Sequence, residues 1–162
     1  MLKAEGNVLA AREILVTLLH GIGSIWPEGE TIGTAPVGDV GYHPRIIRDD
    51  CTNGILPFHK LSQWMSYSLI EPLQDAGLLI KDLDVLTGLA EYRNGGLFVD
   101  TGVLTPKDKH AFSNFYHPKS QLVVEWRGLT IALLDKVATA IRQQTGDDSE
   151  SLPLTSVLQG GT

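Results

Sequence analysis

The chain has 162 residues, of which 43% are hydrophobic, so it is long enough to bury the core of one domain and short for two. Its formal net charge of −6 gives a surface field that repels polyanions, which argues against DNA or RNA as a partner. We therefore expect a single domain, residues 1–162, without a nucleic-acid partner.

The sequence lacks disulfide, metal-ligand and membrane signals. Its one cysteine, Cys51, cannot form an internal disulfide, and no framework of paired Cys or His residues suggests a metal. The first residues do not resemble a secretion signal, and no apolar run approaches the roughly 18 residues that span a membrane. The sequence predicts a soluble, cytoplasmic protein that needs neither metal nor cofactor and does not enter a membrane.

Residues 2–25 carry apolar side chains at mixed three- and four-residue spacings, which predicts an amphipathic helix that ends near Gly21 and Gly23. Residues 28–54 are rich in Gly, Pro, Asp and Thr without a sustained period, so we predict a long irregular loop. Such a long loop in a compact domain is functional or partly disordered. His43, in the GYHP sequence of this loop, is either functional or an ordinary surface histidine.

Pro57 is well placed for the first turn of a helix, where its missing N–H would lack a partner anyway. One face of this helix is expected to pack against a core and is formed by Leu61, Trp64, Met65, Ser68 and Pro72. Because Pro72 lacks a backbone donor, we expect a kink or an end near Ile70. Asp82 or Asp84 is then placed to cap a short helix.

The strongest helical period runs from Gln121 to Arg142 and predicts a helix that ends at Gly146. Its apolar stripe consists of Leu122, Trp126, Leu129, Leu133, Val137 and Ile141. Residues 152–159 are expected to form a short final helix, and the strand-like runs 96–99 and 121–124 are better explained as helix. The predicted fold is mainly α, a single helical domain.

The candidate chemistry lies in two polar groups of residues. Lys60, Gln63 and Tyr67 fall at i, i+3 and i+7 beside the apolar stripe of one helix, a border where pocket walls form and where ordinary half-buried residues also occur. The second group, Glu91-Tyr92-Arg93-Asn94-Gly95-Gly96, follows about one helix later. We hypothesise that the two groups meet at one cleft.

In the second group, a carboxylate at position 91 interrupts an apolar run, and a buried carboxylate is costly without a partner. Arg93 is a partner for Glu91 in a structural ion pair or a ligand for a substrate anion. Asp100 is interpreted as a helix N-cap, with a second acid as the alternative. Glu125 and Arg127 flank Trp126 and point to opposite borders of their helix, so at most one of them is functional.

Long motifs carry a family resemblance: FHKLSQW, LTGLAEYRNGG, DTGVL, LVVEWRGLTIALLDKV and LPLTSVLQGGT. Through them the chain resembles the C-terminal part of the uracil-catabolism family formed by the fourth protein of the URC/URG pathway. Members of that family are more than twice as long as this chain. The resemblance therefore implies a domain that is part of a larger fold.

A weaker similarity links FHKLSQ, LTGLAEYR, GVL and LVVEWR to the FYKRAQ, LTMFADYR, GVL and EIR order of the queuosine-salvage N-glycosidases, which cut a ribose–base bond. The similarity implies a helical architecture like that of helix-hairpin-helix glycosylases. It also implies that Glu91 stands where those enzymes have Asp. The substrate-binding candidates are His59, Lys60, Gln63, Tyr67, Tyr92, Arg93 and Asn94.

The leading hypothesis is a hydrolase of an N-ribosidic bond in a ring-opened uracil nucleotide, a ribosylurea-type substrate. Glu91 is its catalytic residue, and Lys60 with Arg93 holds the ribose or its phosphate. One alternative is a noncatalytic nucleotide-binding or regulatory subunit of the uracil pathway, and another is an inactive truncated remnant. The expected partner is a small nucleoside or nucleotide derivative, and the sequence does not fix the oligomeric state.

Overall fold

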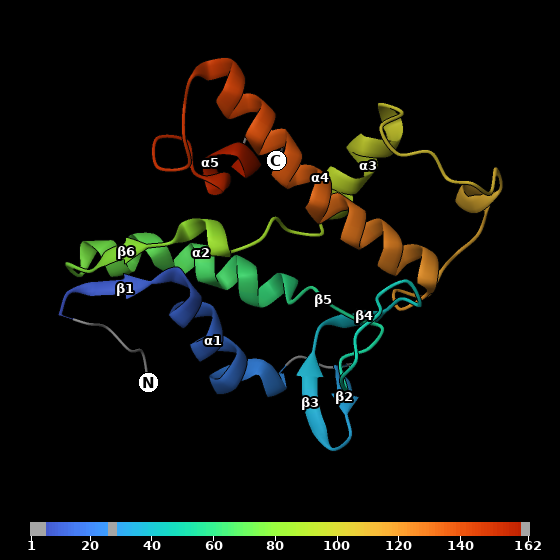
Figure 1. The fold of residues 1–162 in the computed structure, drawn as a ribbon, viewed down its shortest axis with the longest axis horizontal. Coiled ribbons are helices and arrows are strands. Elements are labelled where there is room, and N and C mark those ends of the chain that lie inside the picture. The colour runs from blue at the N-terminus through green and yellow to red at the C-terminus, as the bar shows by residue number, and fades with distance from the viewer. Residues whose placement is uncertain (1–5, 26–28, 160–162) are drawn as a thin grey trace.

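The structure is a computed structural model that describes residues 6–25 and 29–159. Five α-helices and six strands are assigned within these residues, together with three short 3-10 turns (Figure 1). The helices are α1 (Ala11–Ile22), α2 (Lys60–Asp75), α3 (Tyr92–Asp100), α4 (Gln121–Thr145) and α5 (Leu154–Gln159). The strands are β1 (Val8–Ala10), β2 (Glu30–Ile32), β3 (Ala35–Gly38), β4 (Val40–Tyr42), β5 (Ile55–Pro57) and β6 (Leu79–Lys81).

The strands form three separate two-stranded sheets, so the prediction of a mainly α, single helical fold is wrong. β1 pairs in parallel with β6, whereas β2–β3 and β4–β5 are antiparallel pairs. Three of these strands lie in residues 28–54, which we predicted to be irregular throughout. A hairpin forms there nevertheless, because the chain turns at Gly33, which has φ 59°, and the β-branched residues Thr31 and Ile32 of β2 pair with Pro36 and Ala35 of β3.

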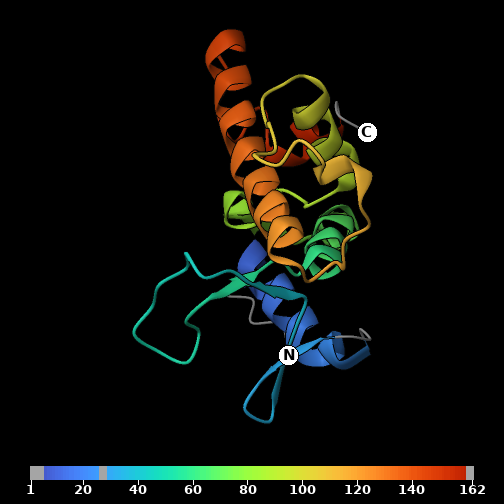
Figure 2. The ribbon, with the colours of Figure 1, turned by 90° about the vertical axis from the view of Figure 1, so that its right-hand side faces the viewer.

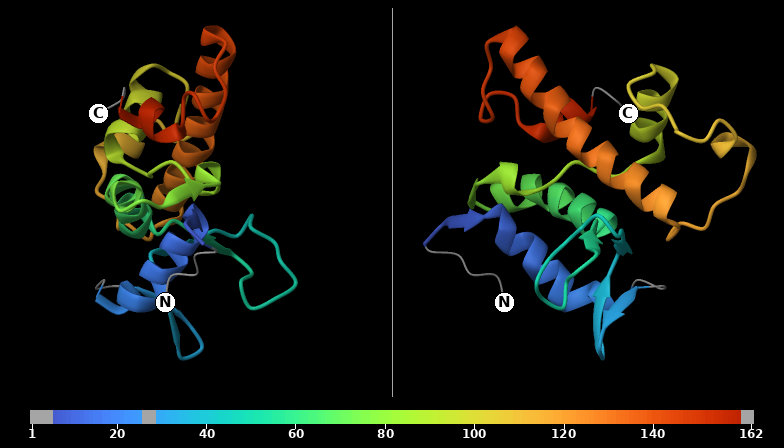
Figure 3. Two further views of the ribbon diagram at one scale, coloured as in Figure 1. Left: turned by 90° about the vertical axis from the view of Figure 1, so that its left-hand side faces the viewer. Right: turned by 45° about the vertical axis from the view of Figure 1, so that its right-hand side comes forward.

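The main apolar cluster lies where α1 and α2 pack against each other next to the β1–β6 pair (Figure 1). Its buried members are Leu9, Ala11, Ile14, Ile80 and Leu86. α4 is the longest helix and crosses above this layer, with α5 packed against it (Figure 2). The β2–β3 hairpin projects away from the helices on the opposite side (Figure 3). This arrangement brings the starts of α2 and α4 close to the β3–β4 turn.

The helix predicted over residues 2–25 is shorter at its N-terminal end. Residues 1–5 lie outside the described residues, and β1 replaces the next part of the predicted helix because its backbone pairs with β6. Gly23 follows the last residue of α1, as predicted. The partners of β1 lie 71 positions further along the chain, and a local hydrophobic period gives no sign of a partner at that distance.

The position and the buried face of α2 both differ from the prediction. Pro57 ends β5, and the helix begins at Lys60 and continues through Pro72 to Asp75. The face predicted to be apolar core is outside, since Leu61 is 45% and Trp64 is 56% exposed. The buried residues are small or polar instead, namely Ser62, Gln63 and Ser66. Ser66 satisfies its hydroxyl internally by donating to the Ser62 carbonyl at 2.8 Å.

The prediction of a long helix that ends at Gly146 is confirmed, and Gly146 has the φ of 79° that favours glycine at this position. Its stripe is rotated, because Leu122 and Leu129 are exposed while Val124, Thr130, Leu134 and Ala138 are buried. The short final helix is confirmed as α5, and residues 96–99 are helical within α3. Asp100 is the last residue of α3, so its predicted role as an N-cap is wrong. Asp82 precedes a 3-10 turn, Leu83–Val85, without a side-chain capping bond.

Candidate functional site

One cavity of about 730 Å³ lies between the C-terminal end of α1, the β3–β4 turn and the starts of α2 and α4. Pockets of this size bind small molecules or cofactors. We call it the Asp39 cavity, and its polar lining residues are His20, Asp39, His59, Ser62, Lys119 and Arg127. Among the predicted site residues, only His59 lines it.

Asp39 holds the elements around the cavity together. Its carboxylate accepts two parallel hydrogen bonds from Arg127 on α4, at 2.9 Å to Oδ1 and 2.8 Å to Oδ2. Oδ2 also accepts the backbone N–H of Lys60 at 3.1 Å. The backbone carbonyl of Asp39 accepts the N–H groups of Phe58 and His59. The Arg127 guanidinium lies 3.9 Å above the centre of the Phe58 ring, so charge and stacking both fix its plane.

The protonation state of Asp39 follows from two opposing effects. Burial alone would raise the pKa of Asp39, but the hydrogen bonds and positive charge of Arg127, with the N–H of Lys60, lower that pKa below its ordinary value. The carboxylate is therefore ionised at neutral pH. It presents a fixed negative charge at the cavity wall.

His59 stands next to Asp39 in an uncommon backbone conformation. It occupies the N-cap position of α2 with φ 46° and ψ 39°, the left-handed region that few non-glycine residues adopt. Burial lowers the pKa of His59, and the nearby charge of Asp39 opposes this shift only in part. The imidazole is neutral at pH 7, so it has one donor and one acceptor nitrogen to offer to a ligand.

The structure brings Lys60 and Glu91, one residue from each of the two polar groups, into contact. The Lys60 ammonium forms an ion pair with Oε1 of Glu91, and both side chains are partly buried. Glu91 is extended at the N-cap position of α3. Neither side chain lines the Asp39 cavity, but Lys60 lies between two residues that do, His59 and Leu61, and its N–H binds Asp39. Lys60 thus connects the carboxylates of Asp39 and Glu91, the first through its backbone N–H and the second through its ammonium group.

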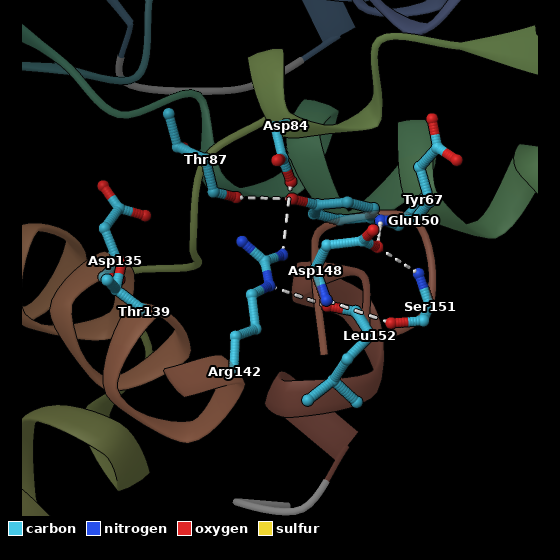
Figure 4. A network of polar contacts seen from close by, with 10 residues as sticks. All are labelled: Tyr67, Asp84, Thr87, Asp135, Thr139, Arg142, Asp148, Glu150, Ser151 and Leu152. Atoms are coloured by element: carbon cyan, nitrogen blue, oxygen red, sulfur yellow. Dashed lines mark hydrogen bonds and ion pairs between the residues drawn. The ribbon is translucent and has the colours of Figure 1, made fainter. Parts of the chain in front are cut away.

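Gln63 and Tyr67 hold the segment before Glu91 against α2. The N–H of Thr87 donates to Oε1 of Gln63 at 3.3 Å. The Tyr67 hydroxyl donates to the Thr87 carbonyl at 2.9 Å (Figure 4). Burial raises the pKa of Tyr67, so its hydroxyl stays a protonated donor. In the same network Arg142 contacts Asp84 at 3.4 Å (Figure 4). These contacts position the chain that leads to the Lys60–Glu91 pair.

The other predicted site residues are on α3. Tyr92 is 68% exposed, and the Arg93 guanidinium lies 5.9 Å from the centre of the Tyr92 ring instead of pairing with Glu91. Asn94 is buried. The structure therefore places Tyr92 and Arg93 on the surface beside Glu91 and outside the Asp39 cavity.

Glu125 and Arg127 do point to different surroundings, as predicted. Arg127 enters the Asp39 cavity, whereas Glu125 lies 3.7 Å from Nε2 of His43 and 3.9 Å from the guanidinium of Arg45. Sequence reasoning missed Asp39 because it stands alone in a Gly- and Pro-rich segment, 88 residues from Arg127. No spacing rule joins residues that far apart.

The described residues thus form a helix-rich domain with small sheets and one cavity of small-molecule size. In residues 6–25 and 29–159 no group of three or more His, Cys, Asp or Glu side chains is arranged to hold a metal. In the same residues no helix has both the length and the apolar character to cross a membrane.

The model of the family "Protein of unknown function (DUF1688)" matches residues 2–162, so the chain belongs to this family. The chain is 39% identical over 158 residues to "Protein urg3" of Schizosaccharomyces pombe, covering 96% of this chain and 37% of that protein. It is 36% identical over 177 residues to "Uracil catabolism protein 4" of Lachancea kluyveri, covering 96% and 40%. The predicted kinship to the uracil-catabolism family is confirmed.

The chain spans about two fifths of the length of these curated relatives. No solved structure matches it. The helix-hairpin-helix glycosylase-like architecture that the weaker similarity implied therefore has no structural neighbour to support it, and the three sheets contradict an all-helical fold of that kind.

Proposed function

We propose that this chain acts in uracil breakdown as a hydrolase of the N-ribosidic bond of a ring-opened uracil nucleotide, a ribosylurea-type substrate. The relative from Lachancea kluyveri bears the name "Uracil catabolism protein 4", which supports the pathway. The observation that carries the reaction type is the pair formed by Lys60 and Glu91 beside the Asp39 cavity.

In this reaction the bond between C1′ of the ribose and the urea nitrogen breaks. Oxygen from water adds to C1′, and a proton from that water goes to the departing nitrogen. Glu91 is proposed to activate the water or to stabilise the positive charge that develops at C1′, as carboxylates do in glycosidases. Lys60 holds the Glu91 carboxylate in place, and Arg93, which is exposed beside it, is proposed to bind the phosphate of the substrate.

The test is the release of urea from N-ribosylurea 5′-phosphate, measured with a urease-coupled assay. Glu91→Gln should lower the rate by about 100-fold or more, the usual contribution of a positioned acid–base group. Asp100→Asn is the matched control, because Asp100 is an exposed carboxylate at the other end of the same helix, α3, and its replacement should leave the rate unchanged. A Glu91→Gln protein that folds and releases urea at the original rate would refute the catalytic role of Glu91, and a wild-type protein that releases no urea would refute the proposed reaction.

A further inference from the structure

The Asp39 cavity contains polar groups that take no part in the proposed role of Glu91. Asp39 and His59 both line it, and of the two only His59 is among the binding candidates that the sequence suggests. Two of the walls are apolar and are formed by Leu19, Val37, Val40 and Leu61. A cavity with mostly apolar walls and a few convergent polar groups is the usual form of a ligand site.

Asp39 keeps capacity to accept a ligand hydrogen bond. A carboxylate has about four acceptor positions, and three are filled by the two Arg127 bonds and the Lys60 N–H. Oδ1 accepts one bond only, and the side chain is 36% exposed. Because Arg127 already balances its charge, the free position suits a neutral N–H or O–H donor better than a cation.

The His59 ring also keeps capacity to form a hydrogen bond with a ligand. Within residues 6–25 and 29–159 its ring makes no hydrogen bond, although the residue is partly buried. Its backbone is held at positive φ, as is that of Gly38, where an added Cβ would make an ordinary van der Waals contact with the ring, 3.6 Å from Nδ1. Such conformations persist where surrounding structure imposes them, and they concentrate at ligand sites.

We propose that the Asp39 cavity is the ligand site of this chain and that Asp39 and His59 bind the hydroxyl and amide N–H groups of a ribosyl ureide. The remaining acceptor position of Oδ1 takes one donor of the ligand, and the neutral imidazole of His59 takes or gives a second hydrogen bond. This assignment rests on the proposed function for the identity of the ligand. The site itself stands on the cavity and its side chains.

Binding of N-ribosylurea to the whole chain, measured by isothermal titration calorimetry, tests the proposal. Asp39→Asn and His59→Gly should each weaken binding by tenfold or more. His59→Gly is expected to fold well, because glycine adopts φ 46° without strain, so the test does not depend on a variant that fails to fold. Asp82→Gly is the matched control, since Asp82 has φ 57° but does not line the cavity, and its affinity should equal that of the wild type.

Wild-type protein that does not bind N-ribosylurea at millimolar concentration would overturn the proposal, as would equal affinity in the wild type and the His59→Gly variant. These outcomes are separate from the test of Glu91. Urea release lost in Glu91→Gln with binding retained supports both ideas, whereas unchanged release in Glu91→Gln removes the catalytic role of Glu91 and leaves the cavity assignment standing.

Discussion

Arg127 and Asp39 lie 88 residues apart and meet in two parallel hydrogen bonds of 2.9 and 2.8 Å. Through this pair the start of α4 is fixed to the β3–β4 turn, and through the Lys60 N–H the same carboxylate is fixed to the start of α2. Three elements that form the cavity are therefore joined at one side chain. Two-point binding of a guanidinium sets both the distance and the orientation of its partner.

Removing the guanidinium should destabilise the fold. Arg127→Met leaves Asp39 partly buried without its main partner, which is expected to lower the free energy of unfolding by about 2 kcal/mol. Urea denaturation followed by circular dichroism measures this. Arg12→Met is the control, because among the residues that the structure describes Arg12 pairs only with the adjacent Glu13, and its side chain is 69% exposed. Its loss should change stability by no more than about 0.5 kcal/mol. Equal effects of the two variants would contradict a structural role for the Arg127–Asp39 pair.

The crossing of α3 and α4 provides a second prediction, with a control one residue away. A Cβ at Gly95 would lie 2.8 Å from Nε1 of Trp126 and 2.9 Å from Oγ1 of Thr130, and the Trp126 N–H already donates to the Gly95 carbonyl at 3.1 Å. Gly95→Ala should therefore cost about 2 kcal/mol of stability through overpacking. At Gly96 a Cβ meets open space, so Gly96→Ala should be neutral or stabilising by up to about 1 kcal/mol, because alanine favours helix. Thermal unfolding of the two variants compares them directly, and a similar midpoint for both would mean that the helices do not cross at Gly95.

The elements that were predicted correctly are those set by local rules. α4 has a strong period and a glycine in the left-handed conformation after its last residue, and both signals act within a few residues. The misplaced features depend on distant partners. β1 exists because of β6, and Asp39 gains its role from Arg127. For the site, sequence reasoning identified Lys60, Glu91 and His59, but it gave no reason to separate the ion pair from the cavity.

The error on α2 has a different cause. The pattern identified an apolar face correctly, yet the opposite face is the buried one. That face combines small or polar side chains with Ile70 and Leu73, which pack against the main apolar cluster. Leu61→Ser with Trp64→Ser should then change the free energy of unfolding by less than about 1 kcal/mol, because both side chains are already near water. Val124→Ala, at a fully buried position, should cost about 2 kcal/mol. A large loss in the double variant, or a change of molar mass in sedimentation, would show that this face is covered in solution.

The dependence of stability on pH tests the environment of His59. Its pKa is lowered by burial, so below about pH 6.5 the unfolded chain takes up a proton that the folded chain does not. The unfolded state then binds more protons, and the free energy of unfolding falls as the pH drops from 6.5 through the lowered pKa of His59. Asp39, whose pKa is also lowered, adds a further loss only at more acidic pH, below about 4.

His59→Gly separates this contribution from that of the other histidines. The wild type and the variant share every other titrating group, including His20 in the same cavity and the Asp39 carboxylate that faces the ring. Between pH 7 and 5 the free energy of unfolding should therefore decrease less steeply in the variant than in the wild type. Urea unfolding at half-unit pH intervals measures both slopes. Parallel curves would mean that His59 takes up its proton equally well in the folded and unfolded chain, and a steeper curve for the variant would mean that the folded protein favours the charged imidazole.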